Sequence, residues 1–339
     1  MNKLKKITVF GAGSWGIAIA ILIHQNGYKV SLWEFFKEDC EKIRKNREQP
    51  DKLPGIKIPA EIDITNDLQS AFADTNGVVL AVPSHVMRAT VRSAKDYIND
   101  HIEFIVSLAK GIENTTLNRM SEVLLQELPE ACHNCIASLS GPSHAEEVSR
   151  FIPTTVVSAA NDINIAEKVQ AVLSCPKFRV YTSTDLIGVE LGGSLKNVVA
   201  IAAGMIHGLK LGDNTMGALI TRGMAEMVRL GRKMGADPMT FAGLSGIGDL
   251  ITTCISRHSR NRYVGEQLGR GFKIDEILSS MKMVAEGVKT TESAYQLAKQ
   301  YNVDMPITTE VYNIIFDNKD PRIALDDLMT RALKPEIWL

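Results

Sequence analysis

The sequence predicts an α/β domain over residues 1–187, followed by an all-α domain over residues 188–339. Two observations indicate the first domain: short runs rich in β-branched residues alternate with helical segments, and a glycine-rich turn follows the first run. One observation indicates the second: from about residue 186 the strand-like runs stop and helical periodicity continues. With 339 residues the chain is long enough for each domain to have its own core.

The alternation in the first half is typical of a mostly parallel sheet with crossover helices. Seven runs are expected to form its strands: ITVF (7–10), KVSLW (29–33), GVVLAV (77–82), EFIVSL (103–108), CIASLS (135–140), TTVVSA (154–159) and RVYTS (179–183). In the second half, residues 216–235 and 291–301 have helical composition and periodicity.

Composition narrows the class of protein. The net charge of −1 provides no overall basic field that would attract nucleic acid. The chain contains no run of 18 apolar residues, so no membrane span is predicted. Of five cysteines only Cys132 and Cys135 are close together, in CHNC. That pair could bind a metal or cycle as a redox pair, but no second ligand pair accompanies it, so we favour chance spacing and expect no metal. The cysteine usage fits a reducing cytoplasm.

The first chemical motif is GAGSWG, residues 11–16, between an apolar strand and a helix that ends near Gly27. Gly11 would permit the tight turn, Gly13 would let the backbone approach a pyrophosphate, and Gly16 would let helix and strand pack closely. The helix N-terminus offers free N–H groups to the anion. The alternative is a glycine-rich turn without a ligand. In this context the motif predicts a Rossmann-type dinucleotide-binding domain.

Glu34 ends the second strand, 18 residues after Gly16. A carboxylate there can accept hydrogen bonds from both ribose hydroxyls and would repel a 2′-phosphate, which favours NAD over NADP. The alternative is a solvated carboxylate at a strand end.

Two further stretches follow strands of the predicted sheet. Lys110, in VSLAKGIE, comes just after an apolar strand and would point into the cofactor crevice, because ligands of such sheets bind beyond the carboxyl ends of the strands. The alternative is a solvated loop lysine. Gly141 and Ser143, in LSGPSHAEEV, form either a plain loop or another wall of the crevice.

Lys196 lies within LGGSLKNVVAIAAG, residues 191–204, which has the composition of a buried helix. On a helix, Lys196 shares one face with Ala200, Ala203 and His207, and the two alanines leave space above it. A buried lysine is costly unless it has a partner or a function. The alternative is that its stem lies along the helix and the ammonium group reaches water.

The stretch LSGIGDLITTCISRHSRNRYVG, residues 244–265, contains an acidic residue and a group of cationic and neutral donors. Asp249 follows a glycine-rich turn and precedes an apolar run, so it could simply cap a helix. The donors could bind a phosphate, since arginine offers a planar fork to its oxygens, or form a solvated basic loop. They are Arg257, Ser259, Arg260, Asn261 and Arg262.

Taken together, the motifs resemble the bacterial NAD(P)-dependent glycerol-3-phosphate dehydrogenases. The resemblance covers almost the whole chain in order: GAGSWG, AVPSH, SLAKGIE, SGPSHAEEV, LGGSLKNVVAIAAG, SGIGDL, SRNR and AEGVKT. It implies an oxidoreductase that transfers hydride reversibly between NAD(P)H and C2 of dihydroxyacetone phosphate. The product, sn-glycerol 3-phosphate, would supply phospholipid synthesis.

The resemblance also implies roles for individual residues. Lys196 would be the general acid/base on the C2 oxygen with Asp249 nearby, and Lys110 would contact both cofactor and substrate. The substrate would further contact Gly141, Ser143, Ser259, Arg260 and Asn261. The cofactor site would include Ser14, Trp15, Ala145, Arg260, Val284 and Glu286, with either Glu34 or Phe35 on the adenosine ribose. A cavity beside Ala200 and Ala203 would admit the three-carbon substrate.

Two alternatives stay open at this point. One is a related two-domain dehydrogenase acting on another phosphorylated or hydroxy-acid substrate, although the arginines argue against a substrate without phosphate. The other is a non-catalytic NAD-sensing module, for which Lys110, Lys196 and Asp249 together are hard to explain. The apolar faces of the helical half permit a homodimer.

Overall fold

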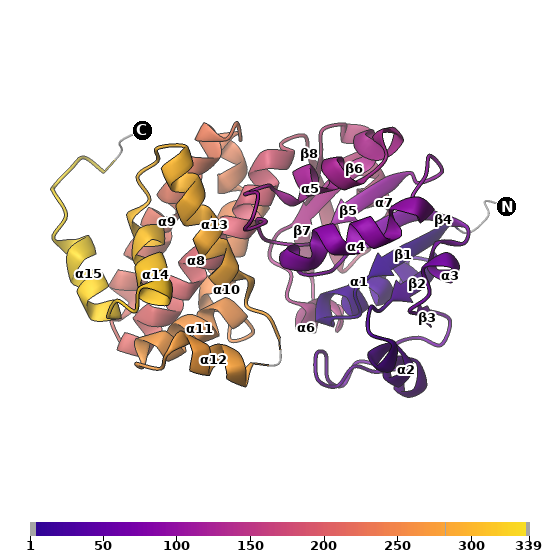
Figure 1. Ribbon diagram of the computed structural model, residues 1–339, viewed down its shortest axis with the longest axis horizontal. Helices are drawn as coiled ribbons and strands as arrows, with labels where there is room; N and C mark the ends of the chain where they lie inside the picture. Colours follow the sequence, from indigo (N-terminus) through magenta and orange to yellow (C-terminus); the bar gives the residue numbers. More distant parts are fainter. Residues whose placement is uncertain (1–4, 282, 337–339) are drawn as a thin grey trace. The chain divides into compact units, whose positions relative to one another are not determined.

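The computed structural model describes residues 5–281 and 283–336, so the ends of the two predicted domains at 1–4 and 337–339 lie outside it. The chain divides into two compact units (Figure 1). The first unit contains the chain up to Lys110 together with Asn118–Glu190, and the second contains Gly111–Leu117 and the chain from Leu191. The units thus divide three residues after the predicted boundary at 187/188. In addition, the short segment Gly111–Leu117 belongs to the second unit.

An eight-stranded sheet forms the centre of the first unit, with strand order β3-β2-β1-β4-β5-β6-β7-β8. Neighbouring strands are parallel except β6 and β7, which are antiparallel. The strands are β1 (Lys6–Phe10), β2 (Lys29–Trp33), β3 (Asp63–Thr65), β4 (Thr75–Leu80), β5 (Phe104–Ser107), β6 (Ile136–Ser140), β7 (Thr154–Ala160) and β8 (Phe178–Ser183). All seven predicted strands are confirmed, and β3 is an additional one.

The strands β1, β4 and β5 are buried along nearly their whole length, as expected for a parallel sheet covered by helices. Helix α1 buries residues 16–23, so it too is apolar on all sides in the core of this unit. The helices are α1 (Ser14–Gln25), α2 (Lys37–Asn46), α3 (Leu68–Phe72), α4 (Met87–Ala94), α5 (Met120–Glu127), α6 (Ala145–Val148) and α7 (Ile163–Leu173).

After β8 the described residues form helices and loops and no further strand. The helices are α8 (Leu186–Leu209), α9 (Asp213–Lys233), α10 (Asp249–Ile255), α11 (Arg260–Gly269), α12 (Ile274–Ser280), α13 (Glu286–Gln300), α14 (Pro306–Phe316) and α15 (Pro321–Met329). Residues Leu244–Gly248, just before α10, form a π-helical turn. The fold class is therefore confirmed: a Rossmann-type α/β part is followed by an all-α part.

Helix α8 is the central helix of the second unit, and α11 packs directly on it. A Cβ added to Gly204 of α8 would lie 2.0 Å from the carbonyl oxygen of Arg262, and one added to Gly265 of α11 would lie 1.8 Å from that of Ile201. Ala200 and Ala203 are fully buried in this helix. Among the described residues α8 is long and apolar enough to cross a membrane, but 94% of its most apolar window is buried, as in core helices of soluble proteins.

Candidate active site

The glycine-rich turn of the first unit has the geometry that its three glycines predict. Gly11 has a φ of +97°, a conformation that favours glycine. A Cβ on Gly16 would lie 1.8 Å from the carbonyl oxygen of Gly11, so only glycine permits this packing of α1. A Cβ on Gly13 would have no atom within 4 Å, and no side chain caps the N-terminus of α1. The turn therefore presents open backbone at a helix N-terminus, which fits a pyrophosphate.

Glu34 is tied to this turn. Its side chain follows β2, is only 5% exposed, and accepts hydrogen bonds from the backbone N–H groups of Ala12 (3.2 Å) and Phe36 (3.3 Å). The interpretation of Glu34 as a solvated carboxylate is thus wrong. Phe35, the alternative residue for the ribose, is 66% exposed, so the two candidates differ in that only Glu34 is fixed against the glycine turn.

Three other predicted cofactor residues of this unit lie at helix starts. Ser14 is the first residue of α1 and is buried, and Trp15 beside it is partly buried on the core. Ala145 is the first residue of α6 and is buried.

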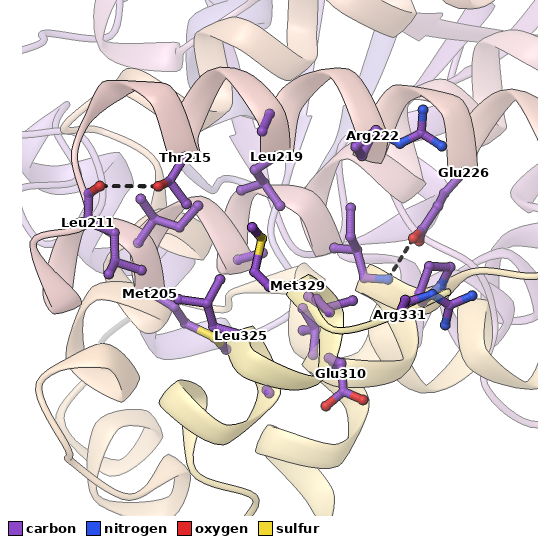
Figure 2. A pocket seen from close by; sticks show the side chains of 18 of the residues that line it. Met205, Leu211, Thr215, Leu219, Arg222, Glu226, Glu310, Leu325, Met329 and Arg331 are labelled. Atoms are coloured by element: carbon purple, nitrogen blue, oxygen red, sulfur yellow. Dashed lines mark hydrogen bonds between the residues drawn. The ribbon is translucent and has the colours of Figure 1, made fainter. Parts of the chain in front are cut away.

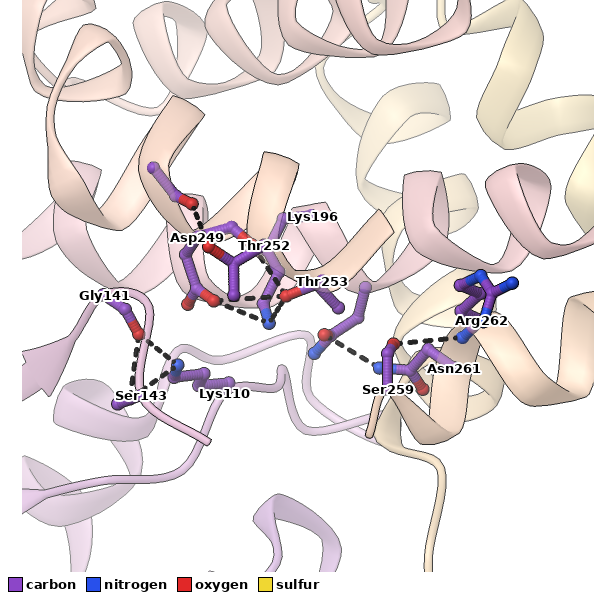
Figure 3. A network of polar contacts seen from close by, with 12 residues as sticks. Lys110, Gly141, Ser143, Lys196, Asp249, Thr252, Thr253, Ser259, Asn261 and Arg262 are labelled. Carbon is purple, nitrogen blue, oxygen red and sulfur yellow. Dashed lines mark hydrogen bonds and ion pairs between the residues drawn. The ribbon is translucent and has the colours of Figure 1, made fainter. Parts of the chain in front are cut away.

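Lys110 lies three residues beyond the carboxyl end of β5. Its Nζ donates to the backbone carbonyl of Gly141 (2.8 Å) and lies 3.5 Å from Oγ of Ser143 (Figure 3). Gly141 follows β6 with a φ of +131°, and Ser143 also donates to its carbonyl (2.9 Å). The structure therefore brings together these three residues of the first unit, and Lys110 is held by the protein rather than simply solvated.

In the second unit Lys196 is buried and paired. Its Nζ lies 3.1 Å from Oδ1 of Asp249 and donates to Oγ1 of Thr253 (2.6 Å), as Figure 3 shows. The lysine is 5% exposed and the aspartate 2%, so the interpretation of a lysine reaching water along its helix is wrong. Because the pair is desolvated, its charges interact far more strongly than they would in water.

Asp249 does not cap its helix. It is the first residue of α10, the N-cap is Gly248, and no side chain caps this end. Its carboxylate instead faces Lys196 and accepts a hydrogen bond from Thr253 (3.2 Å). The helix-cap interpretation is therefore wrong. The π-helical turn before α10 places this residue at the start of a helix with its side chain directed to α8.

The predicted substrate donors lie at the start of α11. Ser259 is the N-cap and accepts a hydrogen bond from the N–H of Arg262, while Arg260 is exposed and donates to the carbonyl of Val284 (2.8 Å). Asn261 is buried. Its side-chain NH₂ group donates a hydrogen bond to Oδ1 of Asn197, and its Oδ1 accepts one from the backbone N–H of Gly287. The stretch is thus a folded helix start rather than a solvated basic loop.

Val284 and Glu286 flank the start of α13. Val284 is exposed and its carbonyl accepts from Arg260, and Glu286 is the first residue of the helix. Arg257, a predicted phosphate donor, is exposed just beyond α10.

Two buried polar residues of this region escaped the sequence analysis. Thr253 joins Lys196 to Asp249, and Asn197 is the partner of Asn261. Thr253 lies one turn after Asp249 on an otherwise apolar helix, a spacing that would have placed both on one face. Asn197 directly follows Lys196, and polar residues in an apolar helix are a signal of the same kind.

Cys132 and Cys135 are free and buried. The Cys135 thiol donates to the carbonyl of Cys132 (2.9 Å), and burial raises the pKa of Cys135 to about 12, so the reactive thiolate is suppressed. Within residues 5–281 and 283–336, no group of three or more His, Cys, Asp or Glu side chains is arranged to hold a metal ion.

Comparison with known proteins gives one consistent result. The family model for the N-terminus of NAD-dependent glycerol-3-phosphate dehydrogenase matches residues 6–166, and the model for its C-terminus matches residues 185–326. The NAD(P)+ glycerol-3-phosphate dehydrogenase of Syntrophotalea carbinolica is 52% identical over 332 residues, which cover 98% of this chain and 99% of the relative. That of Prosthecochloris aestuarii is 48% identical over 331 residues, with the same coverage.

A solved structure agrees with these relatives. The crystal structure of glycerol-3-phosphate dehydrogenase from Coxiella burnetii matches with a TM-score of 0.92 at 34% identity, over 97% of this chain and 99% of that one.

Proposed function

Because this chain belongs to the NAD-dependent glycerol-3-phosphate dehydrogenase family, we propose that it transfers hydride reversibly between NAD(P)H and C2 of dihydroxyacetone phosphate, forming sn-glycerol 3-phosphate. The observation that carries the proposal is the buried ion pair of Lys196 and Asp249. A non-catalytic NAD-sensing module would have no use for this pair, whereas reduction of a ketone is accelerated by a proton donor positioned at the carbonyl oxygen.

The cofactor, when bound, supplies the hydride. In this proposal the open backbone at Gly13 and the N-terminus of α1 bind its pyrophosphate. Glu34 accepts hydrogen bonds from the adenosine ribose, and its negative charge disfavours a 2′-phosphate, so NAD is the preferred coenzyme and NADP the alternative. The further cofactor contacts are Ser14, Trp15, Ala145, Arg260, Val284 and Glu286.

Lys196 provides the proton. As hydride reaches C2, the C2 oxygen gains the electron pair of the carbonyl bond, and the Lys196 ammonium group stabilises this developing alkoxide and then donates its proton to it. Asp249 supports the cationic form of the lysine through the 3.1 Å ion pair, and Thr253 fixes the position of Nζ. In the reverse direction the neutral amine accepts the proton.

In the second unit, the proposed substrate donors lie at the start of α11. Arg260 donates one guanidinium hydrogen bond to Val284, and its planar fork has further N–H groups for phosphate oxygens. Ser259 and Asn261 lie on either side of it and complete the α11 part of this site. Lys110, with Gly141 and Ser143, provides the remaining contacts and is shared with the cofactor.

We also propose that the chain acts in the cytoplasm without spanning a membrane, and that its product supplies phospholipid synthesis. The burial of α8 supports the absence of a span, because a helix covered by protein is not available to lipid. A homodimer is the oligomeric state that we propose, and sedimentation at several concentrations tests it.

The first experiment measures the oxidation of NADH and of NADPH by their near-ultraviolet absorbance, with dihydroxyacetone phosphate as substrate. Wild type should turn over, with NADH at least as good as NADPH. Lys196→Ala should lose at least about a hundredfold in turnover. Lys233→Ala, an exposed lysine at the end of α9, is the matched control and should behave as wild type.

Each outcome has a distinct meaning. Folded wild-type protein that oxidises neither coenzyme would overturn the substrate assignment and return the related dehydrogenases to consideration. Turnover that survives Lys196→Ala would support the proposed function but show that Lys196 is not the required proton donor.

A further inference from the structure

The second unit contains a cavity of about 410 Å³ that includes none of the residues assigned above to cofactor or substrate. Its walls come from α8, α9, α14 and α15 and from the segment after α15, as far as Glu336. Small-molecule sites in proteins are roughly 300–1,000 Å³ and mostly apolar with a few placed polar groups. The volume is near the lower end of that range, which favours a small molecule over an element of another protein.

The residues that line the cavity are mainly apolar at one end and include charged side chains at the other. Figure 2 shows Met205, Leu211 and Leu325 towards one end and Arg222 and Arg331 towards the other. At the apolar end the hydroxyl of Thr215 already donates to the carbonyl of Leu211 (3.1 Å), and Met205, Leu211 and Leu325 have no side-chain hydrogen-bonding group, so this end suits a hydrocarbon chain. The charged groups at the opposite end decide which head group such a chain would carry.

Most of the charged side chains that line the cavity already have partners. Arg229 donates to the carbonyl of Asp304 (2.8 Å), Lys334 pairs with the carboxylate of Asp304 (3.2 Å), and Glu310 pairs with Lys319. Glu226 is 1% exposed and accepts hydrogen bonds from the N–H groups of Ile307 (2.6 Å) and Thr308 (3.0 Å) at the start of α14. Arg331 is paired with the carboxylate of Asp304 (2.9 Å). These two side chains therefore serve the packing of the helices around the cavity.

Arg222 differs from them. It lies on α9, one turn before Glu226, and donates to the backbone carbonyl of Glu336 (3.1 Å). Across the described part of the chain its guanidinium forms no ion pair with a carboxylate. Since an arginine fork is suited to bind a carboxylate through two hydrogen bonds, the polar end of the cavity complements one anionic group.

We propose that this cavity binds an aliphatic carboxylate, with the carboxylate group on Arg222 and the hydrocarbon chain among Met205, Leu211 and Leu325. The occupant is a separate small molecule, neither substrate nor cofactor. The site is independent of the proposed reaction, because none of its residues belongs to the proposed active site.

The test is calorimetric titration of the purified chain with decanoate, kept below its micelle concentration. Wild type should bind decanoate saturably at one site. Arg222→Gln should weaken that binding by about tenfold or more, because the charge-assisted hydrogen bonds are lost. Arg232→Gln is the matched control: it changes an exposed arginine on the same helix that does not line the cavity, and it should bind as wild type.

Two further arms separate the parts of the proposal. Decanol and decyltrimethylammonium should bind at least about tenfold more weakly than decanoate, since neither has an anionic head group for Arg222 to bind. Leu325→Trp, which fills the apolar end, should abolish binding while NADH oxidation continues, which shows that the variant is folded.

Several results would overturn the proposal. They are the absence of saturable decanoate binding to active wild type, equal binding by Arg222→Gln and wild type, and equal binding of the three probes. A dimer that dissociates in Arg222→Gln, with no decanoate bound by wild type, would assign the cavity to contact between two copies instead. Loss of turnover in wild type is a separate outcome that would bear only on the proposed function. If Leu325→Trp alone loses turnover, its folding is checked by thermal unfolding, and binding of decanoate by the folded variant would overturn the placement of the hydrocarbon chain.

Discussion

The Nζ atom of Lys196 lies 3.1 Å from Oδ1 of Asp249, and both side chains are almost completely buried. Two residues separated by 53 positions in the sequence thus form one desolvated ion pair, to which Thr253 adds hydrogen bonds. When one partner of such a pair is removed, the other is left as an uncompensated buried charge, which typically costs about 3–5 kcal/mol.

A double-mutant cycle should detect this coupling. Lys196→Met and Asp249→Asn should each lower the free energy of unfolding by about 3 kcal/mol. The double variant should lose clearly less than the sum of the two losses, because no charge then remains unpaired. Urea unfolding of the four proteins at neutral pH measures the effect. Additive losses would mean that the two charges do not stabilise each other.

The glycines of the phosphate-binding turn should separate folding from cofactor binding. Gly16→Ala would place a Cβ 1.8 Å from the carbonyl oxygen of Gly11, and because backbone must move, a loss of about 3 kcal/mol or more in stability is expected. Gly13→Ala meets no protein atom, so its stability should stay within about 1 kcal/mol of wild type. Its KM for NADH should nevertheless rise by about tenfold, since the methyl group occupies the approach to the pyrophosphate.

These two variants serve as controls for each other. Thermal unfolding gives the stability and NADH oxidation the KM. An unchanged KM for NADH in Gly13→Ala would place the pyrophosphate elsewhere.

The charge of Glu34 should govern the choice of coenzyme. Glu34→Gln keeps an acceptor for the N–H of Ala12 but removes the negative charge, so repulsion of a 2′-phosphate disappears. The ratio of kcat/KM for NADH to that for NADPH should fall by about tenfold. Glu38→Gln, which changes an exposed carboxylate in the first turn of α2, should leave the ratio unchanged. An equal ratio in Glu34→Gln and wild type would instead favour Phe35 as the residue on the ribose.

Glu226 should make stability depend on pH. Burial raises the pKa of this carboxyl from its usual 4.5 to about 7, against the opposing hydrogen bonds from Ile307 and Thr308. The folded state therefore prefers the protonated form. The stability that Glu226 contributes is fully present below about pH 4.5 and is lost as the pH rises through 7.

The comparison with Glu226→Gln isolates this group. The free energy of unfolding of wild type, minus that of the variant, should fall by about 3 kcal/mol between pH 4.5 and pH 8. Urea unfolding across this range measures it. A difference that rises with pH would show that the hydrogen bonds from α14 outweigh burial.

Much of the fold could be predicted because local patterns determine it. Strands β1, β4 and β5 are almost entirely buried runs, because parallel strands covered by helices must be apolar on both faces. In β8 buried and exposed residues alternate at its start, which is also a strand pattern. Strand β3 escaped because it contains only three residues, Asp63–Thr65, too few for a periodicity. The segment Gly111–Leu117 escaped for a different reason: its place in the second unit depends on tertiary contacts, such as that of Asn114 with the carbonyl of Lys289.

The site was predicted as a set of residues but not as a set of contacts. Spacing suggested that Asp249 caps a helix, since the residue follows a glycine-rich turn, yet the π-helical turn directs its carboxylate to Lys196. The sequence around Glu34 indicates only a carboxylate at the end of a strand, and it is the folded turn that brings the N–H of Ala12 within hydrogen-bond distance of it. Such pairings join distant positions, so no local pattern specifies them.

The close packing of α8 has a consequence for synthesis of the chain. Helix α8 ends at Leu209, but the backbone that covers Gly204 belongs to α11 and is made more than fifty residues later. During that interval the nascent chain carries a 24-residue apolar helix without the cover that α11 provides. A chaperone that binds apolar segments would find its binding site here, and synthesis interrupted before Gly265 would leave an aggregation-prone fragment.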